Sequence, residues 1–382
     1  MVIQSNKVWH KEEFQPLQVH MENNHIARIA EYNKVKVDKD YGDSMIIPGL
    51  VDIHTHGYLG LDCNHATIDW LDKWLKYLPS EGVTSVAAST TSICEDTLLT
   101  AMSTIADFME SHESGAGILG IYAEGPLINP KFRGAQNEKA IVAPSPEILQ
   151  KYENTCRGKL IYCCIAPEMD QNFETIRYAA SKGIKIGIGH SGASFETCVG
   201  AKEAGAKSFV HTFNGMPPLH HREPGPVGAA MYLEDMYAEV IGDGVHVDLN
   251  AINVLSKLKG KDKLILVTDS AQIKGLPQGE YHMPGGRHVF LGEDGIGRLP
   301  NGTIAGSTCK MVLSLKNLII GAKLDIKTAI NAATINPLRM LGFDKCKGII
   351  DEGYDADIVV LNEDYAVRCT FVGGQVVFSE SM

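Results

Sequence analysis

The sequence lacks the features that mark membrane, secreted or nucleic-acid-binding proteins. No apolar run approaches the eighteen residues of a membrane-spanning helix, and Met1 to Lys11 contain no signal-peptide core. Lys and Arg number 35 against 46 Asp and Glu, and the formal net charge of −11 argues against nucleic acid or an anionic membrane as a partner. The nine cysteines form no C-x-x-C pair, so we interpret them as reduced thiols of a cytoplasmic protein.

Apolar segments of strand length alternate with amphipathic segments from Pro48 onward, which is typical of a parallel sheet. The eight predicted strands are Val51–His56, Val83–Ala88, Ile118–Ala123, Leu160–Ile165, Ile184–Gly189, Ser208–His211, Ala238–Ile241 and Leu264–Thr268. Eight strand–helix units in about 220 residues have the size of a (β/α)₈ barrel. A doubly wound open sheet is the alternative, but no G-x-G-x-x-G motif follows the first strand.

Helical patterns fit between most of these strands, at Ile68–Leu78, Thr97–Glu110, Phe173–Lys182, Phe195–Ala204, Val227–Leu233 and Asn250–Leu258. A segment rich in Gly and Pro, Ala271–Asn301, predicts a long loop, and helices follow at Met311–Gly321, Ile326–Ala333 and Pro337–Leu341. Short segments at both ends of the chain have the pattern of β-strands separated by turns. We therefore expect a small β-sandwich domain from residues 1–47 and 346–382, and an α/β barrel domain from residues 48–345.

A His-x-His pair ends the first predicted strand. Side chains two residues apart lie on the same face of a strand, so His54 and His56 can both bind one metal ion. Gly57, which follows, lets the backbone turn sharply. The pair alone is equally compatible with two solvated histidines at a strand end.

The residues at the other strand ends favour a metal site over two solvated histidines, because active sites of such barrels lie at the carboxyl ends of the strands. The polar residues that follow the later strands are Glu124, His190, His211, Asn214, Asp243, His246 and Asp269. Imidazole and carboxylate donors suit zinc, iron or manganese, and an open coordination position lowers the pKa of a bound water toward neutrality. The sequence therefore predicts a catalytic metal site that holds one or two ions.

Six motifs together resemble the N-acetylglucosamine-6-phosphate deacetylase family of the amidohydrolase superfamily. They are P-G-x-x-D-x-H-x-H-G, E-G-P, G-H-S, H-x-F-N, D-G-x-H and T-D. The resemblance extends over essentially the whole chain. The segments Glu124–Pro126, His211–Met216 and Arg222–Gly225 are much more specific to the deacetylase than His-x-His is.

The resemblance implies a role for each site residue. Glu124, His190 and His211 are the expected ligands of the principal metal, and His54 and His56 those of a second ion. We expect divalent metal, zinc first, with iron or manganese as alternatives. Asp269 is the expected general acid/base. The expected substrate contacts are Ala135, Asn214, Gly215, Arg222, His246, Ile304, Ala305 and Gly306, with Arg222 binding the phosphate across a homodimer interface.

The implied reaction is metal-dependent hydrolysis of the N-acetyl amide of N-acetylglucosamine 6-phosphate. Alternatives are N-acetylgalactosamine 6-phosphate as the substrate, or another amidohydrolase reaction. Cyclic-amide members often carry a lysine after the fourth strand, where this chain has Ala166-Pro167-Glu168. A non-catalytic scaffold would have lost ligands or the acid, and this chain retains all six.

Two positions depart from the family pattern, which often has His at both. They are Gln136 and Tyr122. We expect Gln136 to alter a contact with the sugar or acetyl group, and neither departure to touch a ligand. The sequence does not separate pocket from surface roles for His220 and His221.

Overall fold

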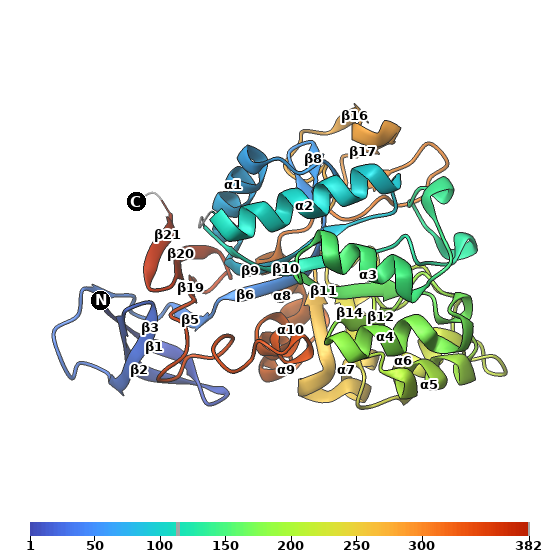
Figure 1. Cartoon of the computed structure of the whole chain (residues 1–382). Coiled ribbons are helices and arrows are strands. Elements are labelled where there is room, and N and C mark those ends of the chain that lie inside the picture. The colour runs from blue at the N-terminus through green and yellow to red at the C-terminus, as the bar shows by residue number, and fades with distance from the viewer. Residues whose placement is uncertain (112–114, 381–382) are drawn as a thin grey trace.

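Eight parallel strands form a barrel in the computed structural model, which describes residues 1–111 and 115–380 (Figure 1). In the order of their pairing the strands are β15 (Leu264–Val267), β14 (Tyr237–Ile241), β13 (Ser208–Phe209), β12 (Lys185–Ile188), β11 (Leu160–Ile165), β10 (Gly117–Ala123), β9 (Val83–Thr90) and β6 (Leu50–Thr55). Each coincides with a predicted strand, apart from small differences at the ends.

The barrel closes between β6 and β15. The backbone N–H of Asp269 donates to the carbonyl of His54 at 2.8 Å, and that of His56 donates to Ser270 at 2.9 Å. The Thr268 hydroxyl donates to the Asp52 carboxylate at 2.5 Å, across the same seam. An open doubly wound sheet would leave two edges unpaired. That alternative is therefore wrong, and the (β/α)₈ barrel is confirmed.

The barrel strands bury both of their faces, which explains why they read as nearly continuous apolar runs. One apolar cluster joins Val51, Ile53 and Val267 of the strands to Leu338 and Met340 near the end of the barrel domain. A larger cluster lies between the strands and the surrounding helices and includes Leu71 and Trp74 of the first helix. Each fully buried large apolar side chain contributes about 1.5–3 kcal/mol. The barrel is thus a rigid support for the side chains at its mouth.

Helices surround the barrel, and hydroxyl side chains begin several of them. Thr67, Ser145 and Ser194 accept hydrogen bonds from free backbone N–H groups in the first turns of α1, α3 and α5. The helices are α1 (Ile68–Tyr77), α2 (Glu95–Ser111), α3 (Pro146–Thr155), α4 (Glu174–Lys182), α5 (Phe195–Ala204), α6 (Gly225–Tyr232), α7 (Leu249–Lys263), α8 (Met311–Lys316), α9 (Ile326–Ala333) and α10 (Ile335–Leu341). α3 has no counterpart among the predicted helices. Over residues 1–111 and 115–380, no helix combines the length and apolar character needed to cross a membrane.

The two ends of the chain join in one sheet, seen as adjacent blue and red ribbons in Figure 1. Its order is β21 (Gln375–Ser379), β20 (Val367–Val372), β19 (Ile358–Leu361), β5 (Met45–Pro48), β1 (Val2–His10), β2 (Glu13–Glu22) and β3 (His25–Glu31), with β4 (Lys39–Asp40) paired to β1. Ile26 of β3 and Phe371 of β20 share one apolar core, so the sheet curves around it as the layers of a sandwich do. We propose the division into residues 1–47 with 346–382, and 48–345. Residues 381–382 of this division lie outside the described residues.

A second small sheet lies beyond the barrel mouth, at the top of Figure 1. It contains β16 (Gly279–His282), β17 (His288–Leu291) and β18 (Gly297–Arg298), all antiparallel. We call residues 279–298 the mouth sheet. The prediction of a structureless loop over Ala271–Asn301 is wrong for this part, because Met283, Val289 and Leu291 bury against Ala271 and Ala305. A further short pair, β7 (Gly57–Tyr58) and β8 (Leu61–Asp62), follows β6. Gly57 is needed there because a Cβ atom would lie 2.3 Å from the carbonyl of Leu61.

Candidate functional site

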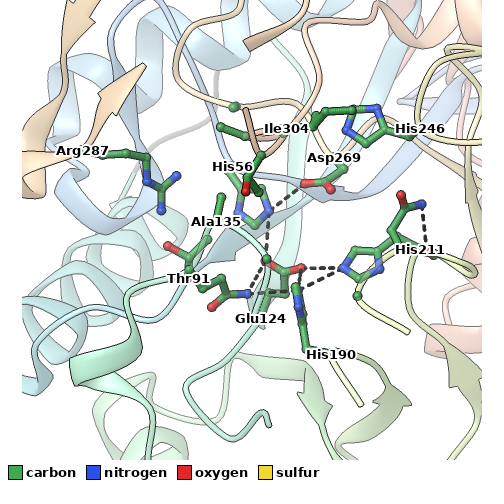
Figure 2. A pocket seen from close by; sticks show the side chains of 18 of the residues that line it. His56, Thr91, Glu124, Ala135, His190, His211, His246, Asp269, Arg287 and Ile304 are labelled. Carbon is green, nitrogen blue, oxygen red and sulfur yellow. Dashed lines mark hydrogen bonds and ion pairs between the residues drawn. The ribbon is translucent and has the colours of Figure 1, made fainter. Parts of the chain in front are cut away.

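A cavity of about 320 Å³ opens at the carboxyl ends of the barrel strands (Figure 2). It is lined by most of the predicted site residues, namely His56, Glu124, Ala135, His190, His211, Asn214, Gly215, His246, Asp269, Ile304, Ala305 and Gly306. His54 lies behind this lining and is fully buried. Arg222, the remaining predicted residue, does not line the cavity of its own chain.

The Glu124 carboxylate lies at the centre of the predicted donors. Its Oε1 atom is 3.0 Å from Nε2 of both His190 and His211, and 3.3 Å from Nε2 of His54. Its Oε2 atom is 3.4 Å from Nε2 of His56. A single carboxylate therefore faces four imidazole nitrogens, as Figure 2 shows for His56, His190 and His211.

The donors divide into two groups that could each hold a metal ion. Glu124, His190 and His211 form one group, and His54, His56 and Asp269 form the other; within each group the donor atoms lie within 4.8 Å of one another. Asp269 Oδ1 is 3.1 Å from Nε2 of His56. The structure thus brings together all six residues expected around the metal.

Buried acceptors fix the orientation of three of these imidazoles. Each Nδ1 atom faces an oxygen outside the cavity: His54 faces Glu239 Oε2 at 3.0 Å, His56 the Ser89 carbonyl at 3.0 Å and His190 the Phe132 carbonyl at 2.8 Å. A neutral ring that donates from Nδ1 leaves the lone pair on Nε2 free. In all three histidines that lone pair is directed at the Glu124 side of the cavity, which is the usual second-layer arrangement around a metal-bound histidine.

The contacts among the nitrogens fit a divalent cation. Nε2 of His190 and Nε2 of His211 are 3.1 Å apart beside Glu124. Within the described chain, the buried Nε2 of His54 has no hydrogen-bond partner at all. Nitrogen lone pairs packed this closely need either retained protons or a cation between them. Imidazole and carboxylate donors suit zinc, iron and manganese, so the residues present fit such an ion.

The electrostatics of the donor set lead to the same conclusion. Burial raises the pKa of Glu124, but the charge of His54 and hydrogen bonds from two other histidines outweigh it, and the pKa lies well below its ordinary value. Burial also opposes ionisation of Asp269, yet His54 and His56 lower the pKa of this carboxyl to about 2. Burial disfavours a charged His54, but the charges of Asp269 and Glu124 outweigh it and raise its pKa well above the ordinary value. The two carboxylates thus require positive charge beside them, which a divalent ion supplies.

The two departures from the family pattern both touch the donor set, so the expectation that neither does is wrong. Gln136 donates from Nε2 to Glu124 Oε2 at 3.0 Å, and its own Oε1 accepts from the backbone N–H of Ser92 at 2.9 Å. The ring of Tyr122 packs edge to face against His54, with centroids 4.9 Å apart. Gln136 therefore orients the shared carboxylate as well as lining the cavity.

Arg222 and the histidines beside it lie on the surface. Its Nη1 atom is 2.8 Å from His221 Nε2, and the rings of His220 and His221 are 4.5 Å apart. All three residues are exposed. The structure places none of them in the cavity of the same chain, and the reach of Arg222 into a partner subunit stays a prediction.

Arg287 is the functional candidate that the sequence did not reveal. It lies in the turn between β16 and β17 and is the single Arg or Lys among the described residues that line the cavity. Figure 2 shows its guanidinium directed into the cavity, on the side away from His246. Arg287 is thus a cation of the same chain at the cavity, in addition to the Arg222 that is predicted to come from a partner subunit. The short apolar run Val289-Phe290-Leu291 is the one signal for a strand in this segment, and it does not indicate which way Arg287 points.

A closed parallel barrel with divalent-metal donors at its carboxyl end is the architecture of a metal-dependent hydrolase. The chain belongs to the amidohydrolase family, whose family model matches residues 45–377. It is 34% identical to the N-acetylglucosamine-6-phosphate deacetylase of Bacillus subtilis (strain 168), over 88% of this chain and 85% of that protein. It is 32% identical to an N-acetylgalactosamine-6-phosphate deacetylase of Escherichia coli O157:H7, over 87% of both.

A solved structure supports the same relationship. The chain superposes with a TM-score of 0.94 on a mutant N-acetyl-D-glucosamine-6-phosphate deacetylase of Mycobacterium smegmatis in complex with N-acetyl-D-glucosamine-6-phosphate. The two chains are 27% identical, and 99% of each is covered. The match therefore includes the terminal sheet as well as the barrel.

Proposed function

We propose that this protein hydrolyses the N-acetyl amide of N-acetylglucosamine 6-phosphate, giving glucosamine 6-phosphate and acetate. The observation that carries the proposal is the convergence of two metal-donor groups, one of them containing Asp269, on a single cavity. The similarity to deacetylases of N-acetylated amino-sugar 6-phosphates supports the choice of substrate. An amide is a poor electrophile, and a site of this kind supplies what its hydrolysis needs.

In this proposal Glu124, His190 and His211 would hold the principal ion, and His54 and His56 would hold a second one. A bound divalent ion supplies Lewis acidity, which polarises the amide carbonyl and makes a water molecule more acidic. We propose zinc, with iron or manganese as alternatives, because the donors are imidazoles and carboxylates without thiolate. Gln136 and Glu239 keep the donors in position from outside.

Asp269 acts as the general base and then as the general acid. Its carboxylate is ionised at neutral pH, and its Oδ1 faces the cavity beside His56. It takes a proton from the attacking water and passes it to the amide nitrogen, because the amine cannot leave unprotonated. The second proton of that water leaves as the carboxylic acid product ionises, so the products are acetate and the protonated amino sugar.

The remaining lining residues bind the sugar and its phosphate. We assign this to Asn214, His246 and Ala135, and to the backbone of Gly215 and of Ile304 to Gly306. Gly215 has φ of +61°, and a Cβ atom there would lie 2.9 Å from His190 Nδ1, so this position admits only backbone. Arg222 would bind the phosphate of a partner subunit in a homodimer. Location in the cytoplasm stays a prediction from the sequence.

The substrate assignment is tested by measuring acetate release from N-acetylglucosamine 6-phosphate, N-acetylgalactosamine 6-phosphate and unphosphorylated N-acetylglucosamine, together with metal analysis. We expect the highest kcat/KM with N-acetylglucosamine 6-phosphate and little turnover without the phosphate. The galactosamine compound is the second candidate because one of the relatives is named for it. Equal rates with and without the phosphate would contradict the proposal.

A further inference from the structure

Three side chains with metal-donor atoms lie together on the mouth sheet, outside the catalytic cavity. Glu280 and His282 belong to β16 and His288 to β17, and their donor atoms all lie within 4.8 Å of one another. None of the three is among the described residues that line the catalytic cavity. The mouth sheet is set apart from the barrel strands in Figure 1.

The antiparallel register explains this grouping. His282 pairs directly opposite His288, and Glu280 precedes His282 by two residues, so all three side chains lie on the same face of the ribbon. The two imidazole rings stack with centroids 4.4 Å apart and planes at 16°. Glu280 Oε1 is 2.5 Å from His288 Nε2. Two imidazoles and one carboxylate therefore converge on the same point of the surface.

The contact between Glu280 and His288 is close without being a hydrogen bond. His288 Nε2 is buried and lacks a hydrogen-bond partner among the described residues, although a carboxylate oxygen lies next to it. Two histidines and a carboxylate are a donor set that zinc uses, with the fourth position left to water.

We propose that Glu280, His282 and His288 bind one divalent transition-metal ion, zinc foremost, at a site separate from the catalytic centre. An ion held there ties β16 to β17 at the two ends of the turn that contains Arg287. Because Arg287 lines the catalytic cavity, the ion would limit the motion of a pocket cation without touching the substrate. This inference stands independently of the proposed function, because both readouts below are independent of activity.

The test counts metal ions on the holoenzyme. Protein saturated at the catalytic centre is dialysed against micromolar zinc chloride, and bound metal per chain is measured by plasma mass spectrometry. The wild type should hold one ion more than the double variant His282→Gln/His288→Gln. The matched control is His25→Gln, which removes an exposed imidazole paired with a single carboxylate, Asp355, at 3.1 Å. This control should keep the additional ion.

A second measurement follows amide hydrogen exchange over residues 279–291. Added zinc should slow exchange there in the wild type and in His25→Gln, and have no effect in the double variant. If the double variant does not fold, the exposed single variant His282→Gln replaces it, with zinc affinity expected to fall about tenfold or more. Equal ion counts in all variants, or exchange that zinc does not change, would overturn the proposal and leave an ordinary ion pair.

Discussion

The molecule carries two clusters of histidine and carboxylate that differ in how they are supported. In the barrel mouth, His54 is 0% exposed and Glu124 4%, and Glu239 fixes the outer nitrogen of His54. On the mouth sheet, Glu280 and His282 are exposed. In the described part of the chain, no hydrogen bond orients the ring of His282.

This difference separates a preorganised centre from an adaptable one. Donors that are buried and held from behind keep their geometry without the ion, as a catalytic centre requires. Exposed donors on the mouth sheet must be ordered by the ion itself, which lowers affinity and allows exchange with the medium. We therefore expect the two clusters to respond very differently to the same substitution.

The largest effect is expected for Glu124→Gln. Loss of the shared carboxylate should lower both metal content at the centre and turnover, the latter by at least about 10³-fold, since Lewis acidity contributes several kcal/mol. The matched change on the mouth sheet, Glu280→Gln, should leave kcat unchanged and affect only the additional ion. Metal analysis and acetate release measure both. A fully metallated, fully active Glu124→Gln protein would remove Glu124 from the centre.

The second largest effect is expected for Asp269→Asn, which should lower turnover while the metal stays bound. Asp269→Asn should reduce kcat by about 10²-fold or more, because proton transfer in the transition state is typically worth that much. Substrate binding should be largely retained, measured by calorimetry with N-acetylglucosamine 6-phosphate. Weak binding together with normal turnover of what is bound would make Asp269 a positioning residue instead.

The same contrast explains what could be predicted from the sequence. The barrel strands are buried on both faces, so each appears in the sequence as an apolar run that predicts a strand. The polar residue that ends such a run is then a predicted metal donor or catalytic acid at the carboxyl end of that strand. Glu124, His190, His211 and Asp269 are found in this way. Contacts between residues that are far apart in the sequence cannot be predicted from such local patterns. Glu239 reads as one polar residue inside an apolar strand, and only folding brings it behind His54.

The mouth sheet was missed for a related reason. Its strands are four residues long or shorter and are separated by Gly and Pro, so turn residues dominate the pattern. Its order comes from tertiary burial of Met283 and Val289 against the barrel loops, which no local signal encodes. Arg287 depends on that burial for its direction, and the sequence could not place it in the cavity.

The third effect concerns the two candidate cations, Arg222 from a partner subunit and Arg287 from the same chain. Arg222→Ala should raise KM for the phosphorylated sugar about 10- to 150-fold, since a charge-assisted contact is worth roughly 1.5–3 kcal/mol. Mixing this variant with Asp269→Asn should restore part of the activity, because one site of each mixed dimer has both groups intact. Arg287→Ala mixed with Asp269→Asn should show no such recovery. Failure of Arg222→Ala to recover despite subunit exchange would mean that it does not act across the dimer.

The smallest effect is expected from Glu239→Gln, which acts on the support and not on a donor. Glu239 is fully buried and accepts hydrogen bonds from His54 Nδ1 at 3.0 Å, from the backbone N–H of His211 at 3.2 Å and from the Tyr162 hydroxyl at 2.5 Å. A carboxamide of the same shape replaces one of these acceptors with an N–H donor and removes the charge. Affinity for metal at the His54 and His56 group should then fall about tenfold, as for other outer partners of metal ligands.

At saturating metal, kcat should be nearly restored, because the donors themselves are unchanged. Activity titrated against zinc concentration measures this. Tyr162→Phe is the control, since it removes the hydrogen bond from the Tyr162 hydroxyl and keeps the carboxylate. An unchanged zinc dependence in Glu239→Gln would show that burial alone orients His54. A shift would show that the carboxylate behind the ring is what distinguishes this histidine from His282 on the mouth sheet.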